Sequence, residues 1–89
     1  MSRHAVYQIL AEKDLRCAIC ELSLEKEWEE LQQWKKNPKS IKRTSINIDL
    51  DHIVPKRLIK DQKWKNGLEN LQLTHRTCNN RKGGEIIYN

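Results

Sequence analysis

The spacing of cysteines and histidines constrains this chain more than any other feature. Cys17 and Cys20 are separated by two residues, and His75 and Cys78 repeat that spacing after 54 intervening residues. A two-residue spacing lets one turn direct both side chains at one ion, and two such turns complete the tetrahedron that Zn²⁺ prefers. All three cysteines and one of only three histidines fall into this pattern. The sequence therefore predicts a closed Cys₃His zinc site with a structural role.

The size and composition of the chain favour such a metal site. The 89 residues are 37% hydrophobic and 33% charged, and they include no Phe. Small domains with so thin a core usually depend on a metal or on disulfides, and zinc binding in zinc-finger peptides is worth on the order of 10 kcal/mol. Disulfides would leave one of the three cysteines unpaired. The alternative is that Cys17 and Cys20 are a redox pair or buried thiols and that His75 is a surface histidine.

The charge of the chain points to its partner. Lys and Arg outnumber Asp and Glu, which gives a formal net charge of +5. This charge favours a polyanionic partner, and nucleic acid is the leading candidate. Charged residues recur from the first residues onward, so neither a secretory signal nor a membrane span is predicted. We therefore expect a cytoplasmic protein with reduced thiols, in which paired cysteines more often bind metal.

Hydrophobic periodicity predicts two helices before the middle of the chain. The first covers residues 4–14 and places Ala5, Val6, Ile9 and Leu10 on one face. The second covers residues 23–36, with Ser23 as the expected N-cap. Its apolar stripe consists of Leu24, Trp28 and Leu31, and Trp34 extends it.

Two short strands and a last short helix are predicted for the second half. Residues 45–51 alternate between apolar and polar side chains, and residues 71–74 also read as a strand. A loop that contains Pro55 and Gly67 separates them, and the segment after Cys78 has helix-start character. No linker divides the chain, so residues 1–89 are expected to form a single domain.

The first predicted strand ends in an acid and an imidazole, Asp51 and His52. Antiparallel pairing with residues 71–74 would bring both near Asn79, directly after Cys78. Asp51 and Asn79 would offer oxygen ligands suited to Mg²⁺ or Mn²⁺, and an imidazole can take a proton from water. A metal facing a phosphate and a base facing a water are the elements of phosphodiester hydrolysis. The simpler interpretation is that Asp51 and His52 form a hydrogen-bonded pair at the end of a strand and that Asn79 is a helix N-cap.

Three segments together resemble the HNH endonuclease family in its zinc-stapled, cysteine-flanked form. They are CAIC (17–20), DLDHIVPKR (49–57) and NGLENLQLTHRTCNNRKGG (66–84). The resemblance spans residues 17–84. It implies a small α+β fold, with a ββα-metal (His-Me finger) core, a structural Cys₃His zinc site and N-terminal helices.

The resemblance also implies roles for individual residues. His52 matches the general base, Asp51 and Asn79 match the ligands of a catalytic divalent ion, and Asn70 matches the residue that braces the loop and orients the histidine. The chain departs from the family pattern at two positions. Its three motif residues, His52, Asn70 and Asn79, read H-N-N instead of H-N-H, and His75 stands where relatives commonly have cysteine. Asn80 is the alternative to Asn79 as the last ligand.

The activity implied by the resemblance is metal-dependent hydrolysis of DNA, which leaves 5′-phosphate and 3′-hydroxyl ends. The implied cofactors are structural Zn²⁺ and a catalytic Mg²⁺, Mn²⁺ or other divalent ion, and RNA stays open as a substrate. Two alternatives remain, a zinc-stapled module that binds nucleic acid without cutting it, and an assembly protein that docks through the helix bearing Trp28 and Leu31. The expected phosphate contacts are Arg57, Arg76, Arg81 and Lys82, and the basic run Lys35, Lys36, Lys39, Lys42 and Arg43 could extend them.

Overall fold

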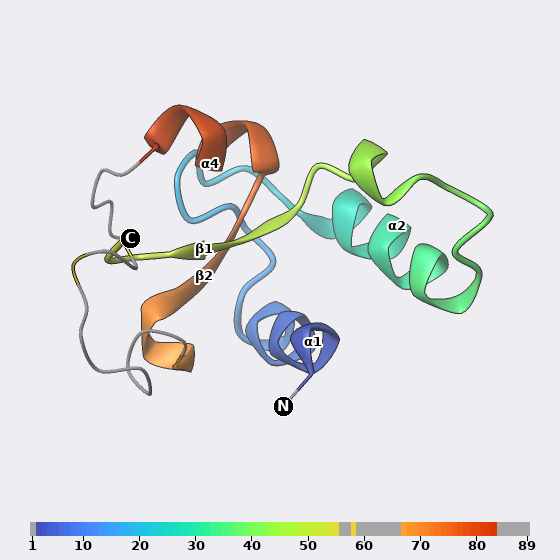
Figure 1. The fold of residues 1–89 in the computed structure, drawn as a ribbon, viewed down its shortest axis with the longest axis horizontal. Coiled ribbons are helices and arrows are strands. Elements are labelled where there is room, and N and C mark those ends of the chain that lie inside the picture. The colour runs from blue at the N-terminus through green and yellow to red at the C-terminus, as the bar shows by residue number, and fades with distance from the viewer. Residues whose placement is uncertain (1, 56–57, 59–66, 84–89) are drawn as a thin grey trace.

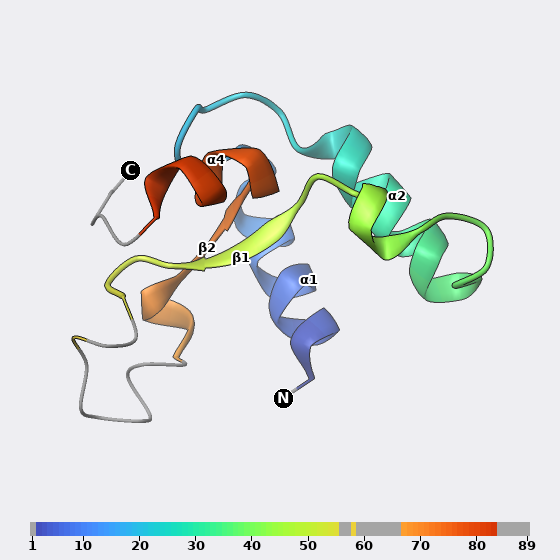
Figure 2. The same cartoon turned by 45° about the horizontal axis from the view of Figure 1, so that its top comes forward.

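The computed structural model describes residues 2–55, 58 and 67–83. Within these ranges, helix α1 (Arg3–Lys13) and helix α2 (Glu25–Lys36) precede strand β1 (Asp49–His52), strand β2 (Leu71–Thr74) and helix α4 (Arg76–Lys82). Helix α1 packs against β2, and α4 packs against β1. Figures 1 and 2 show the two strands at the centre, with α4 above them, α1 below them and α2 beyond one end. The predicted small α+β fold is confirmed.

The two strands pair antiparallel, as expected. Asp49 faces Thr74, Asp51 faces Gln72 and His52 faces Leu71. Strand β1 begins later than the predicted 45–51, because residues 43–45 form a 3₁₀ turn and β2 offers partners only from Leu71 to Thr74.

The first helix buries a different face from the predicted one. Ser2 caps α1 by accepting a hydrogen bond from the Ala5 amide (3.2 Å), but the buried residues of the helix are Tyr7 and Ala11. The predicted face of Ala5, Val6, Ile9 and Leu10 was therefore wrong in part, because only Leu10 of these residues packs against the core. One reason is that the Tyr7 hydroxyl accepts a hydrogen bond from Arg43 Nη2 (3.1 Å), a long-range contact that helical periodicity does not report.

The second helix follows its predicted stripe. Leu24 and Leu31 are buried, and Trp28 packs partly buried against the same core. The helix begins at Glu25, two residues later than predicted, with Leu24 in the cap position. Ser23 still satisfies one helix-end donor, because its hydroxyl accepts from the Glu25 amide (3.1 Å).

The core joins both halves of the chain. The buried leucines and isoleucines of this core are Leu24, Leu31, Ile46, Ile48 and Leu73.

The last helix starts one turn earlier than expected, with His75 as its N-cap, so Asn79 lies inside α4 and not at its start. The helix ends at Gly83, whose φ of +59° is accessible to glycine at low cost. Among the described residues, no helix is long and apolar enough to cross a membrane.

Candidate functional site

The four predicted zinc ligands come together. The ligand atoms of Cys17, Cys20, His75 and Cys78 all lie within 4.8 Å of one another. The Ala18 amide donates to the Leu73 carbonyl (2.9 Å), which fixes the cysteine turn on β2 shortly before that strand leads into His75. Tetrahedral zinc with Zn–S bonds of about 2.3 Å places its sulfurs about 3.8 Å apart. The donor set therefore fits a metal ion, consistent with zinc.

The environment of Cys17 favours its thiolate. Burial raises the pKa of the Cys17 thiol, but hydrogen bonds from the backbone of Cys20, His75 and Ile19 outweigh it, and the pKa falls to about 6. The amides of Ile19 and His75 donate to Cys17 Sγ at 3.4 and 3.3 Å. Burial, together with the Cys20 side chain, raises the pKa of the Cys78 thiol. The pKa of the Cys17 thiol is therefore lower than that of the Cys78 thiol, so Cys17 forms its thiolate more readily.

Both ring nitrogens of His75 lie near other side chains. Its Nδ1 lies 3.4 Å from Cys20 Sγ, and its Nε2 lies 3.9 Å from Glu27 Oε1 on α2. Both side chains are largely buried, with 13% and 15% of their surface exposed. Histidines that ligate metals usually direct the outer ring nitrogen at a carboxylate or carbonyl. Sequence reasoning missed Glu27, since no local pattern relates α2 to His75.

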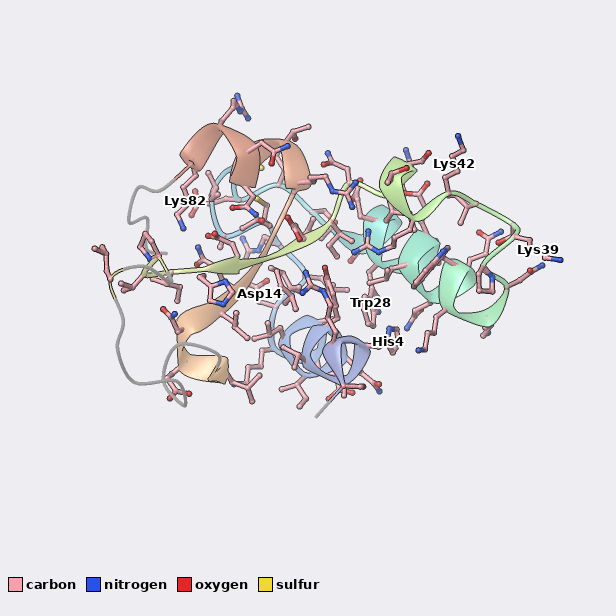
Figure 3. The ribbon with its side chains drawn as sticks, viewed as in Figure 1. His4, Asp14, Trp28, Lys39, Lys42 and Lys82 are labelled. Atoms are coloured by element: carbon pink, nitrogen blue, oxygen red, sulfur yellow. The ribbon has the colours of Figure 1, made fainter. Side chains whose placement is uncertain are left out.

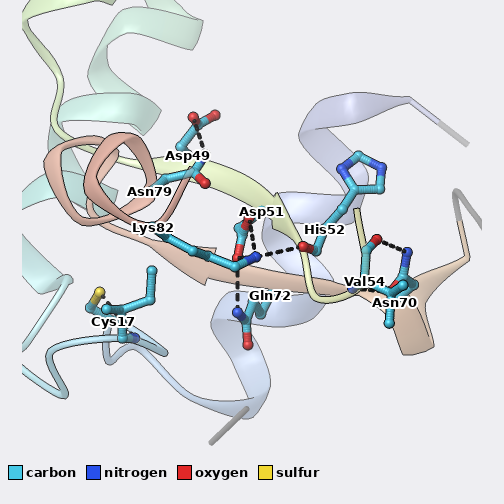
Figure 4. Close-up of polar contacts among 10 residues, drawn as sticks. Cys17, Asp49, Asp51, His52, Val54, Asn70, Gln72, Asn79 and Lys82 are labelled. Carbon is cyan, nitrogen blue, oxygen red and sulfur yellow. Dashed lines mark hydrogen bonds and ion pairs between the residues drawn. The ribbon is translucent and has the colours of Figure 1, made fainter. Parts of the chain in front are cut away.

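A second polar cluster lies where β1 meets α4. Asp51 is buried (5% exposed), and both of its carboxylate oxygens accept hydrogen bonds from Lys82 Nζ, at 2.9 and 2.7 Å. The same ammonium donates to the His52 carbonyl (2.7 Å), and Gln72 donates to Asp51 Oδ2 (2.9 Å). Figure 4 shows the Lys82 side chain reaching from α4 to Asp51 and the His52 carbonyl. A buried carboxylate is thus neutralised by a buried ammonium.

Asn79 lies in the same cluster but contacts a different acid. Its Nδ2 donates to Asp49 Oδ2 (2.9 Å), and Arg3 lies 3.6 Å from the other Asp49 oxygen. Asp49 was not among the predicted site residues. The alternation of strand side chains could have identified it, because residues two apart in a strand share a face and Asp51 lies two positions later.

The loop after His52 is held by Asn70, which is fully buried. The Asn70 side chain accepts from the Val54 amide (2.9 Å) and donates to the Val54 carbonyl (3.3 Å). The Ile53 amide in turn donates to the Asn70 carbonyl (2.9 Å). Asn70 therefore fixes the two residues that follow His52, as Figure 4 shows for Val54.

The β1–α4 cluster has the donor types that a hard divalent ion prefers. Asp49, Asp51 and Asn79 bring oxygen atoms to this interface, and such ligands suit Mg²⁺ or Mn²⁺. In the present arrangement Lys82 holds both Asp51 oxygens, and Asn79 directs its amide nitrogen at Asp49. An ion held by Asp51 together with Asn79 would therefore share the Asp51 carboxylate with Lys82.

The predicted phosphate contacts have different surroundings. Arg81 is exposed, with its guanidinium 3.6 Å from Cys78 Sγ, whereas Arg76 donates to the Thr44 carbonyl (2.9 Å). Lys82, expected at the surface, has only 1% of its side chain exposed, because it serves as the counter-ion of Asp51. Arg57 lies outside the described residues.

The comparison with protein families follows the same segments. A family model described as HNH endonuclease matches residues 35–85, which is more than half of the chain. No curated protein and no solved structure matches the chain. The match includes β1, β2, α4, His75 and Cys78, whereas α1 and the Cys17–Cys20 turn precede it. The chain belongs to the HNH endonuclease family.

Proposed function

We propose that this protein is a metal-dependent endonuclease that hydrolyses DNA phosphodiester bonds, and that residues 1–89 act as one nuclease domain. The observation that supports this proposal most is the arrangement of buried polar residues before and after His52. A buried acid precedes this histidine, and the fully buried Asn70 clamps the residue two positions after it. Buried polar groups cost stability unless they are bonded, and this chain with its thin core keeps Asp51 buried directly before His52 and Asn70 buried against the loop after it.

Each residue has a defined part in the proposed reaction. His52 takes a proton from the attacking water, and Asn70 fixes the loop that determines how the imidazole lies. Asp51 and Asn79 would hold the divalent ion, with Asp49 bonded to Asn79 beside them. When bound, such an ion supplies positive charge to the scissile phosphate and to the departing 3′ oxygen. The expected products carry 5′-phosphate and 3′-hydroxyl ends.

Phosphate contacts outside the reacting centre are assigned to Arg76 and Arg81, and to Arg57 in the undescribed segment. Lys82 is better placed to neutralise Asp51 than to contact phosphate, because its ammonium is buried. The basic residues after α2 would add further positive charge and make binding strongly salt-dependent.

The alternative is a zinc-stapled module that binds nucleic acid without cutting it. The metal-ligand group and the basic surface serve that function equally well. A function limited to binding gives no reason for the arrangement of Asp51, His52 and Asn70.

A plasmid-nicking assay separates the two functions. Zinc-loaded protein is incubated with supercoiled plasmid with and without added Mg²⁺ or Mn²⁺, and the ion is omitted instead of chelated so that the zinc stays bound. We expect nicking by the wild type only with the added ion. His52→Ala should keep its zinc, its melting temperature and its DNA affinity but lose nicking.

Two outcomes would contradict the proposal. Equal nicking by wild type and His52→Ala would remove the histidine from the reaction. DNA binding by both proteins with no nicking under any ion would establish the binding module instead.

A further inference from the structure

A pocket lies between α1 and α2, away from the metal-ligand group. Its volume is about 240 Å³. The buried side chains of Tyr7 and Leu31 form its apolar part together with the partly buried Trp34. Arg3, Lys35 and Arg43 supply positive charge, and none of the described lining residues is acidic. Tyr7, Leu31 and Trp34 all precede the segment matched by the family model, so the pocket belongs mainly to this chain's own N-terminal part.

The arginine in this pocket is held between two aromatic rings. The Arg43 guanidinium carbon lies 5.9 Å from the ring centroids of both Tyr7 and Trp34. Its Nη2 donates to the Tyr7 hydroxyl (3.1 Å), whereas its Nη1 is buried and has no hydrogen-bond partner among the described residues. Aromatic rings and guanidinium planes are the surfaces on which nucleic-acid bases stack. The pocket therefore combines a stacking surface with a fixed positive charge.

The start of α1 adds to the positive potential. Ser2 and His4 line the same pocket, so the first turn of this 11-residue helix borders it. The unpaired amides at a helix N-terminus favour anions. Because they act together with three cationic side chains, a phosphate is favoured at the rim.

The pocket is connected to the candidate catalytic cluster. Arg3 lines the pocket and also lies 3.6 Å from Asp49, which accepts a hydrogen bond from Asn79. A nucleic-acid strand that crosses β1 at Asp49 would meet Arg3 next and then the pocket.

We propose that this pocket binds an unpaired nucleotide of the nucleic-acid substrate, with the base against Trp34 and Leu31 and the phosphate against Lys35 and Arg3. The inference rests on the proposed function in so far as nucleic acid is the substrate. A bare inorganic anion would leave the apolar part of the pocket uncovered, and an apolar peptide would bring no negative charge to Arg3, Lys35 and Arg43. A nucleotide matches both parts, and the preference is for single-stranded DNA beside the cleaved bond.

Fluorescence anisotropy tests this directly. Zinc-loaded protein, without added divalent ion so that no DNA is cut, is titrated onto a labelled blunt duplex and onto the same duplex with a short single-stranded extension. The wild type should bind the extended duplex more tightly. In Trp34→Leu that preference should shrink about five-fold or more, the lower end of what base stacking contributes, and it should also shrink in Lys35→Gln, which removes the charge assigned to the phosphate.

Lys39→Gln is the matched control, because it removes the same charge from an exposed lysine that does not line the pocket. Figure 3 shows Lys39 at the outer end of the turn after α2, well separated from His4. This variant should keep the preference for the extension. Lys35 is exposed too, so its substitution tests the pocket without endangering the fold, and melting curves check Trp34→Leu.

The proposal is overturned if the wild type does not prefer the extension, or if the preference survives in Lys35→Gln. It is also overturned if Lys35→Gln and Lys39→Gln weaken binding of both duplexes equally, since that would be a general charge effect. Failure of the nuclease proposal would give a different result. In that case the pocket variants would still lose their preference for the extension, but neither the wild type nor any variant would nick plasmid.

Discussion

Lys82 Nζ lies 2.7 Å from Asp51 Oδ2, and this pair joins α4 to β1 in the interior of the protein. All three donors of the ammonium are used, two on Asp51 and one on the His52 carbonyl. Removing one partner of a buried ion pair is costly because it leaves an uncompensated charge. The same contact decides how Asp51 and the backbone of His52 lie relative to α4.

We predict that Lys82→Met destabilises the fold by about 3–5 kcal/mol, because Asp51 is left buried without its counter-ion. Urea unfolding measures the change, and Lys26→Met on the exposed face of α2 should leave stability nearly unchanged. The double variant Asp51→Asn with Lys82→Met should recover part of the loss. Equal stability of the two single lysine variants would show that the buried pair is energetically unimportant.

Cys17→Ser should abolish zinc binding and unfold most of the protein. Cys17 is one of the four side chains positioned to bind a metal ion, and zinc binding, which contributes on the order of 10 kcal/mol in zinc-finger peptides, is comparable with the whole stability of a small domain. Zinc content and a thermal melt by circular dichroism are the measurements. Ala18→Ser changes the same turn without removing a ligand and should keep both properties. A Cys17→Ser protein that melts like the wild type would contradict the structural role of the site.

Glu27→Ala should lower zinc affinity roughly ten-fold while leaving the four ligands in place, because the carboxylate orients His75 from its outer nitrogen. Competition with a chromophoric chelator gives the affinity. Glu29→Ala removes an exposed acid from the same helix and serves as the control. If both variants hold zinc equally well, the 3.9 Å approach of Glu27 to His75 has no function in metal binding.

Asn70→Ala should cost about 1–3 kcal/mol, since it leaves the amide and carbonyl of Val54 without their partner. If Asn70 also orients His52, nicking should fall further than stability explains, even at a temperature where the variant is fully folded. Comparison with Asn37→Ala, an exposed amide at the end of α2, shows how much an ordinary asparagine contributes. Full nicking by folded Asn70→Ala would limit Asn70 to a structural role.

The sequence alone determined the features that depend on short-range pattern. Two-residue ligand spacing predicted which four side chains meet at the metal group. The strand-like residues 71–74 predicted β2, and the stripe of Leu24, Trp28 and Leu31 predicted the buried face of α2. These signals are local, because a turn or a helix face is set by residues a few positions apart.

Apart from the metal group and the pairing of the two strands, only the tertiary structure decided which residues become partners across the chain. It shifted the buried face of α1 to Tyr7 and Ala11, paired Asp51 with Lys82 and placed Glu27 beside His75. Each of these contacts joins residues at least 31 positions apart, and their formation depends on how helices and strands pack around a small core. Charge and residue type say that an acid or a base is present, but packing selects the counter-ion that it meets.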